Sequence, residues 1–169
     1  SKSASMEDLW EKQKADRTSL GVFKPKTVRD LVIKPDSPDW KPKFKAALLQ
    51  ARLWETRKVT MEPPRKVPFK FEYRFECDDR RCKGRHRMMI EDWEVGALFW
   101  RLVDQGESQE RAAEKVREKF LCEICGPEKE TYFYVGTVLG FNKWVVIGVF
   151  YPNKKFRDKL GDKSHLLFE

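Results

Sequence analysis

The clearest pattern of hydrophobic and polar positions lies in residues 68–77. Aromatic residues and one cysteine occupy every second position, and charged residues fill the positions between them. This alternation predicts a strand with one buried face and one solvent-exposed face, as is typical of an antiparallel sheet. Because Cys77 continues the aromatic face, we expect its sulfur to point toward the interior at the end of the strand. The buried positions are Phe69, Phe71, Tyr73, Phe75 and Cys77, and the charged positions are Lys70, Glu72, Arg74 and Glu76.

Helical patterns occupy the middle of the chain and two shorter segments. Residues 89–104 carry an apolar surface broader than a narrow stripe, which indicates a helix packed on more than one side. Ser108 is the expected N-cap of a second helix that runs to about Cys125. Residues 43–54 also show helical periodicity, and residues 6–16 predict a short polar helix of low independent stability.

Strand patterns flank the helices. Residues 20–33 are strand-like around an interruption at Pro25, and residues 131–139 and 143–151 predict a hairpin. We therefore predict an α+β fold: an antiparallel sheet of about four to five strands with helices packed on one face. Residues 1–19 are assigned to an N-terminal extension or short helix, and residues 20–169 to a single domain.

Charge is distributed unevenly along the chain and favours a polyanionic partner. The net charge is +8, and residues 12–87 carry 22 lysines and arginines against 10 aspartates and glutamates. No run of eighteen apolar residues is present and no signal peptide is visible, so we expect an intracellular, cytoplasmic protein without a membrane segment. A reducing compartment makes clustered cysteines more often metal ligands than disulfides.

Five residues have the spacing of a metal site. Cys77 and Cys82 enclose a short loop, His86 follows, and Cys122 and Cys125 form a Cys-x2-Cys pair at a predicted helix end. Thiolates and imidazoles at such spacings are typical zinc ligands. We predict a zinc-stabilised loop held by Cys77, Cys82, His86 and Cys125. An all-cysteine set with Cys122 in place of His86 remains open, as does the interpretation that the cysteines are small core residues.

A basic loop surrounds this predicted site and indicates nucleic-acid binding, to DNA or RNA. The candidate phosphate-binding residues are Arg80, Arg81, Lys83, Arg85 and Arg87 in the loop, with Lys41, Lys43 and Lys45 as a possible extension of the surface. In the competing interpretation, Asp78 and Asp79 pair with the arginines and the charge run is only a solvated surface. We therefore predict a zinc-stabilised nucleic-acid-binding accessory or recognition domain that is not itself catalytic.

Two other functions stay open from the sequence alone. The first is a protein-interaction module whose basic surface meets an acidic partner within a larger assembly. The second is a metal-dependent nuclease that uses Asp92 and Glu94, carboxylates near the start of the long predicted helix. Acidic residues are also common at helix N-termini for electrostatic reasons alone. We favour this explanation of Asp92 and Glu94 over the nuclease.

Overall fold

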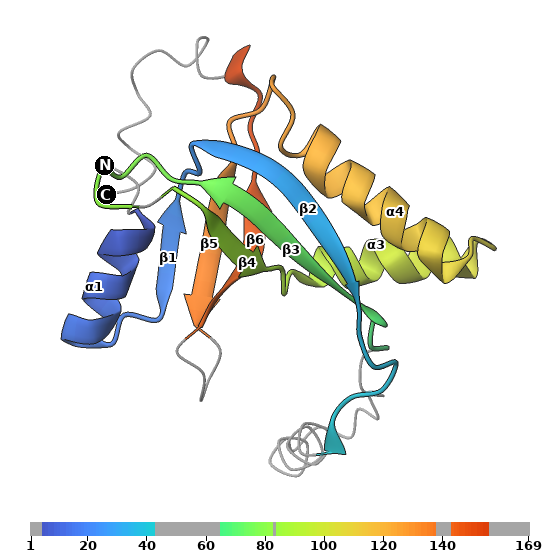
Figure 1. The fold of residues 1–169 in the computed structure, drawn as a ribbon. Coiled ribbons are helices and arrows are strands. Elements are labelled where there is room, and N and C mark those ends of the chain that lie inside the picture. The colour runs from blue at the N-terminus through green and yellow to red at the C-terminus, as the bar shows by residue number, and fades with distance from the viewer. Residues whose placement is uncertain (1–4, 43–64, 83, 138–142, 156–169) are drawn as a thin grey trace, which may run out of the picture.

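The computed structural model describes residues 5–42, 65–82, 84–137 and 143–155 of the 169-residue chain. Within these residues, six strands form two three-stranded antiparallel sheets, accompanied by three α-helices (Figure 1). Sheet A has the order β1 (Leu20–Phe23), β5 (Tyr132–Thr137), β6 (Trp144–Phe150), and sheet B has the order β2 (Thr27–Pro35), β3 (Phe69–Glu76), β4 (His86–Met89). The helices are α1 (Met6–Asp16), α3 (Trp93–Asp104) and α4 (Gln109–Glu118), and a short π-helix, η1 (Lys119–Glu123), extends α4.

The predicted α+β class is confirmed, but the prediction of one sheet of four to five strands is wrong. The chain changes sheets between β1 and β2 at Pro25, which has no N–H to continue a strand ladder. Strand β4 ends at Met89, where we expected the long helix to start, and that helix begins only at Trp93. The sequence of β4, His-Arg-Met-Met, does not alternate between apolar and polar residues, so its pattern does not predict a strand.

The core lies between the inner faces of the two sheets. Tyr73 of β3 stacks on Phe133 of β5 with ring centroids 4.8 Å apart, and Phe75 lies 5.4 Å from Phe23 of β1. All four side chains are almost completely buried. The predicted buried face of residues 69–77 is therefore confirmed at Phe71 and at the positions that follow it.

The two sheets are joined along one side. Ile90 and Val146 form an isolated parallel bridge between the end of β4 and β6, and the Glu91 N–H donates to the Val146 carbonyl at 2.7 Å. On the other side, the chain itself connects the sheets, because it crosses from β1 of sheet A to β2 of sheet B. Directly after this crossing, the Lys26 N–H donates to the Glu76 carbonyl of β3 at 2.7 Å. The sheets thus enclose the aromatic core as two linked layers.

Helix α1 is part of this core. Ser5 caps its N-terminus in a capping box with Asp8, which satisfies N–H groups that the first turn leaves unpaired. Met6 and Leu9 are buried, and a Cβ atom at Gly21 would lie 2.2 Å from Leu9 Cδ2. Gly21 therefore leaves the space that Leu9 fills. Tertiary packing of this kind stabilises a helix whose sequence alone predicts little stability.

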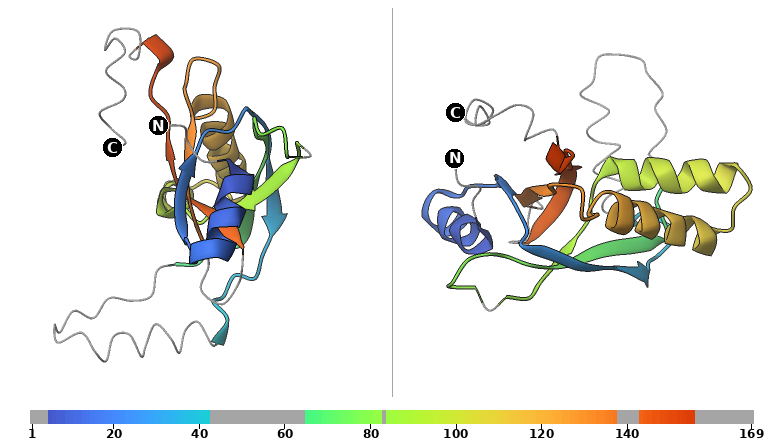
Figure 2. Two further views of the ribbon diagram at one scale, coloured as in Figure 1. Left: turned by 90° about the vertical axis from the view of Figure 1, so that its left-hand side faces the viewer. Right: turned by 90° about the horizontal axis from the view of Figure 1, so that it is seen from above.

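Helices α3 and α4 form a pair at the opposite end of the molecule from α1 (Figures 1 and 2). The predicted N-cap Ser108 is present, and its hydroxyl accepts from the Arg111 N–H. Arg117 of α4 donates from Nε to the Leu31 carbonyl at 2.8 Å and pairs with Asp30. These contacts cover the free edge of β2. The helices lie at two ends of the sheets, which differs from the predicted packing on one face.

Two of the predicted segments fall outside the described residues. These are the helix at residues 43–54 and the loop between the two strands of the predicted hairpin. Among the residues that the structure describes, no helix has the length and apolarity needed to cross a membrane.

Candidate metal centre

Three of the predicted ligands meet at the end of sheet B. His86 Nε2 lies 3.1 Å from Cys77 Sγ and 2.7 Å from Cys82 Sγ, and the three donor atoms all lie within 4.8 Å of one another. The antiparallel pairing of β3 and β4 explains this, because Phe75 lies opposite His86 and both side chains face the interior. Cys77 follows two residues later on the same face of the chain. This group can hold a metal ion.

The surroundings favour the neutral, metal-binding form of His86 but the protonated thiol of Cys77. The Gly84 N–H donates to Cys82 Sγ at 3.3 Å, and Gly84 has a φ of 85°, a conformation that suits glycine. Burial lowers the pKa of His86, which keeps the imidazole neutral. Burial also raises the pKa of the Cys77 thiol to about 11, so a metal ion would have to displace this proton on binding.

Aromatic rings hold His86 on two sides. Phe75 stacks against the imidazole with ring centroids 5.2 Å apart, and Trp10 of α1 meets it edge-on at 6.1 Å. These contacts restrict the rotation of the imidazole. Helix α1 is consequently a wall of the candidate centre as well as a part of the core.

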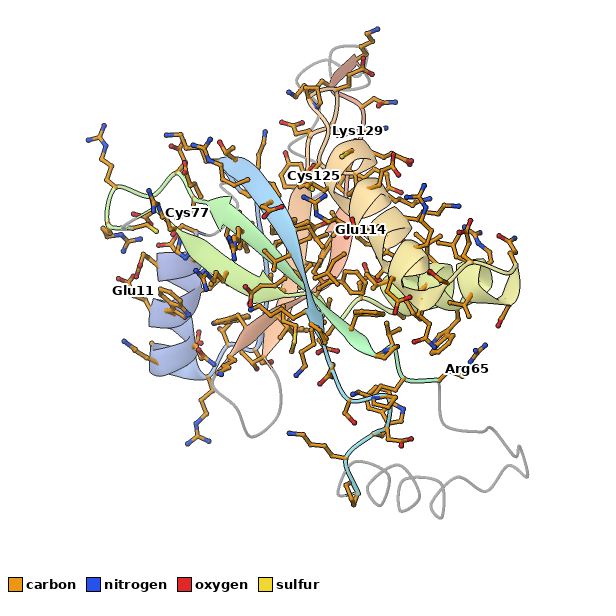
Figure 3. All side chains as sticks on the ribbon, turned by 45° about the vertical axis from the view of Figure 1, so that its right-hand side comes forward. Glu11, Arg65, Cys77, Glu114, Cys125 and Lys129 are labelled. Atoms are coloured by element: carbon orange, nitrogen blue, oxygen red, sulfur yellow. The ribbon has the colours of Figure 1, made fainter. Side chains whose placement is uncertain are left out.

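Cys125 lies apart from this group, although we predicted it as a ligand. Its thiol donates to the Tyr73 hydroxyl at 3.8 Å, and that hydroxyl donates to the Phe120 carbonyl at 2.9 Å. Tyr73 precedes Cys77 by four strand residues, or roughly 13 Å along the chain. Cys77 lies beside α1 and Cys125 lies beyond α4 in Figure 3. Cys122 is exposed, and among the described residues neither cysteine joins the three-donor group.

Arg81 is the loop arginine with the most internal partners. It forms ion pairs with Asp79 at 2.7 Å, Asp8 at 2.5 Å and Glu11 at 2.9 Å. The hydrogen bond from Arg81 is the largest cause of a strong lowering of the Asp79 pKa, and the Ser5 hydroxyl adds to it. Arg81 therefore ties the loop to α1. For Arg81, the interpretation that the loop arginines pair with carboxylates of the protein therefore holds, because its guanidinium N–H groups already have partners.

The other predicted phosphate-binding residues have different surroundings. Arg80, Arg85 and Arg87 are exposed, and within the described part of the chain they form no ion pair. Asp78 pairs with Lys26 at 3.3 Å instead of with an arginine. Lys41 is exposed beyond β2, at the opposite end of sheet B from the loop. Lys43, Lys45 and Lys83 lie outside the described residues.

The carboxylates considered for a nuclease are explained by helix capping. Asp92 is the N-cap of α3, and its Oδ1 accepts from the Glu94 N–H at 2.9 Å. Burial raises the Asp92 pKa, which opposes the charge needed to bind magnesium. Among the described residues, the candidate metal group contains neither Asp92 nor Glu94.

The sequence patterns did not single out the exposed aromatic residues of sheet A. Tyr134 is exposed although its strand neighbours Phe133 and Val135 are buried, and Phe150 is exposed at the end of β6. The available signal was the run Tyr-Phe-Tyr-Val in β5, where no polar residue occupies the positions that alternation assigns to solvent.

Together, the fold and the site define a two-sheet α+β domain with a Cys2His group at one end. The chain belongs to a family described as a domain of unknown function (DUF8757), whose family model matches residues 2–168. No curated protein and no solved structure matches the chain.

Proposed function

We propose that this protein is a zinc-stabilised domain that binds nucleic acid through the loop between β3 and β4, as a recognition or accessory component rather than a catalyst. One observation carries the proposal: the loop after β3 and the start of β4, which together contain Cys77, Cys82 and His86, also expose arginines without ion pairs among the described residues. These arginines are Arg80, Arg85 and Arg87.

The donor set supports zinc. Thiolates are soft donors and imidazole is a borderline donor. Zinc binds such donors, whereas magnesium and calcium prefer oxygen ligands. Three protein ligands leave a fourth position for water or another donor. Because the aromatic core is built from both sheets, the metal would order the hairpin end of sheet B without creating the fold.

Loop rigidity supports phosphate binding. A metal at the base of the loop and the Arg81 contacts to α1 would hold the loop from two sides. Ordering the loop before it meets a ligand lowers the entropic cost of binding. The net charge of +8 suits a phosphate-rich partner.

Metal content tests the first half of the proposal. Purified protein should carry about one equivalent of zinc, and Cys82→Ser should lose it, because structural zinc sites bind tightly. Cys122→Ser is the matched control, since Cys122 is exposed outside the three-donor group. Less than about half an equivalent in the wild type, or equal loss in both variants, contradicts a zinc site at these residues.

Salt-dependent binding tests the second half. Arg80→Ala and Arg85→Ala should each weaken binding to DNA or RNA and reduce the slope of log K against log salt by about 0.7–0.9. Arg111→Ala removes the same charge from the exposed surface of α4, away from the loop, and should leave binding nearly unchanged. Absence of binding at low salt, or equal effects of all three substitutions, contradicts recognition by this loop.

A further inference from the structure

The outer face of sheet A is an uncharged surface with exposed aromatic residues. Strands β1, β5 and β6 contain no Asp, Glu, Lys or Arg. Their register places Val22, Tyr134 and Gly148 in one row across the sheet and Tyr132 beside Phe150 in the next. Leu20 is 66% exposed, Phe150 43%, Ile147 42% and Tyr134 38%. The residues of this face are Leu20, Val22, Tyr132, Tyr134, Gly136, Ile147, Gly148 and Phe150.

Glycine keeps the aromatic rings accessible. A Cβ atom at Gly148 would lie 3.8 Å from Tyr134 Cβ and 3.9 Å from its Cδ2, so the side of this ring toward β6 is open. The rings of Tyr132 and Phe150 lie 6.2 Å apart at an angle of 41°. A flat ring of a ligand can therefore rest on these side chains without displacing a neighbour.

Lysines border this face near the ends of its strands. Lys24 Nζ lies 5.6 Å from the Tyr132 ring and Lys129 Nζ lies 5.7 Å from the Tyr151 ring. Lys24 also pairs with the buried Glu130, while Lys143 and Lys155 are exposed. An uncharged aromatic surface with a positive border fits a polyanion that carries flat apolar rings.

These observations favour single-stranded nucleic acid over a second copy of the chain. A two-fold interface would place the same face of two molecules together and bring their bordering lysines toward one another. A single strand instead offers phosphates to the lysines and unpaired bases to the rings. A duplex hides its bases in the stack and cannot use such a surface.

The surface also adjoins the candidate metal centre. The chain leaves β1 at Lys24, and Lys26 pairs with Asp78 of the loop at 3.3 Å. Only one residue separates Lys24 from Lys26, so a strand lying on sheet A can continue to the loop arginines. In Figure 1, the end of β1 and the loop after β3 occupy the same upper part of the molecule.

We infer that the outer face of sheet A is a base-stacking surface for single-stranded nucleic acid, with Tyr134 and Phe150 beneath the bases and the bordering Lys129 near the phosphates. The inference rests on the proposed nucleic-acid-binding function and adds the form of the ligand and a second contact surface.

Fluorescence anisotropy with labelled oligothymidylate and oligouridylate tests this inference. Tyr134→Ala and Phe150→Ala should each weaken binding by about 5- to 150-fold, which corresponds to the stacking energy of one base. Tyr134→Phe keeps the ring and should bind within about twofold of the wild type. Gly148→Val fills the space beside Tyr134 and should weaken binding while the protein stays folded. The matched control is Trp93→Ala, because Trp93 is an exposed aromatic residue on α3.

Each outcome decides between specific alternatives. Preference for either single strand over a duplex of the same length, with the predicted order of variants, supports the inference and identifies DNA or RNA as the better ligand. Weakened binding in Arg85→Ala but not in Tyr134→Ala or Phe150→Ala overturns the stacking surface and leaves the proposed function intact. Absence of binding by the wild type at low salt overturns both. A dimer in sedimentation that Tyr134→Ala dissociates assigns the face to self-association and overturns the inference, as does equal weakening by Trp93→Ala.

Discussion

The inner faces of the two sheets are similar, but their outer faces differ in charge. Both line the core with buried aromatic residues, such as Phe133 in sheet A and Tyr73 in sheet B. On the outer face of sheet B, charged residues alternate along β3 and pair across strands, as in Glu72 with Lys34 at 3.0 Å and Glu76 with Arg29 at 3.1 Å. The outer face of sheet A has no charged residue in its strands.

The outer face of sheet B carries ion pairs, whereas the outer face of sheet A leaves apolar rings in contact with solvent. The ion pairs of Glu72 with Lys34 and of Glu76 with Arg29 help to set the register of β2 against β3. A surface whose charges are already paired gains little from a partner. The outer face of sheet A leaves its apolar rings to solvent, so it gains more when a ligand covers it. The candidate metal loop lies between these two extremes, with Arg81 paired and its neighbouring arginines exposed.

The largest expected effect separates the two faces of a single strand. Phe133→Ala removes a buried ring that contacts Phe23, Tyr73 and Phe75, and should lower the free energy of unfolding by about 3–5 kcal/mol. Tyr134→Ala, one residue later on the outer face, should cost less than about 1 kcal/mol. Urea denaturation of both variants measures the difference. Equal losses would mean that the outer face is part of the folding core, and would remove the contrast between the sheets.

The sequence predicted the regions where one periodicity dominates. Alternation in residues 69–77 identified β3 and its buried face, and capping chemistry identified Ser108. Proximity of Cys77, Cys82 and His86 followed from ligand spacing, because all three lie in one hairpin. The position of Cys125 depends on how α4 packs against β3, which spacing along the chain does not specify.

Long-range pairing was the other feature hidden from the sequence. Arg81 contacts Asp8 and Glu11, about 70 residues away in the chain, and these contacts decide which loop arginine is engaged. Similarly, the division into two sheets depends on the crossing at Pro25 and on the Ile90–Val146 bridge. Local patterns describe strands one at a time and cannot assign them to sheets.

Zinc removal should have the second-largest effect and should act on one sheet. At a free zinc concentration 100 times its dissociation constant, the ion would stabilise the protein by about 2.7 kcal/mol. Chelation should therefore lower the melting temperature and speed amide hydrogen exchange in β4 and α1, while β5 and β6 stay protected. Cys122→Ser provides the control, since it should respond to chelation as the wild type does. Uniform loss of protection in both sheets would show that the metal supports the whole fold.

A charge reversal tests the pairing on sheet B. Glu72→Lys would place a third lysine among Lys34 and Lys70 and remove the ion pair with Lys34. We expect a loss of about 0.5–1 kcal/mol that shrinks in high salt, because the side chain of Lys34 is close to half exposed. Glu72→Gln is the control that removes the pair without adding a like charge. A loss that does not depend on salt would indicate that packing, rather than charge pairing, determines this face.

The smallest expected effect is a loss of stability in acid, which we expect to begin in sheet B. Asp36 follows β2 and pairs with Lys66 at 2.8 Å and Lys70 at 3.1 Å, and hydrogen bonding to Lys66 is the main cause that lowers its pKa from 3.8 to about 2. A carboxyl whose pKa is lower in the folded state stabilises the protein above its unfolded pKa and loses this contribution as the pH falls toward 2. Asp36→Asn should therefore remove less than about 1 kcal/mol near neutral pH and flatten the decline below pH 4. Hydrogen exchange during acid titration should show the β2–β3 end of sheet B opening before sheet A, whose strands carry no carboxylate; opening of sheet A first would contradict this assignment.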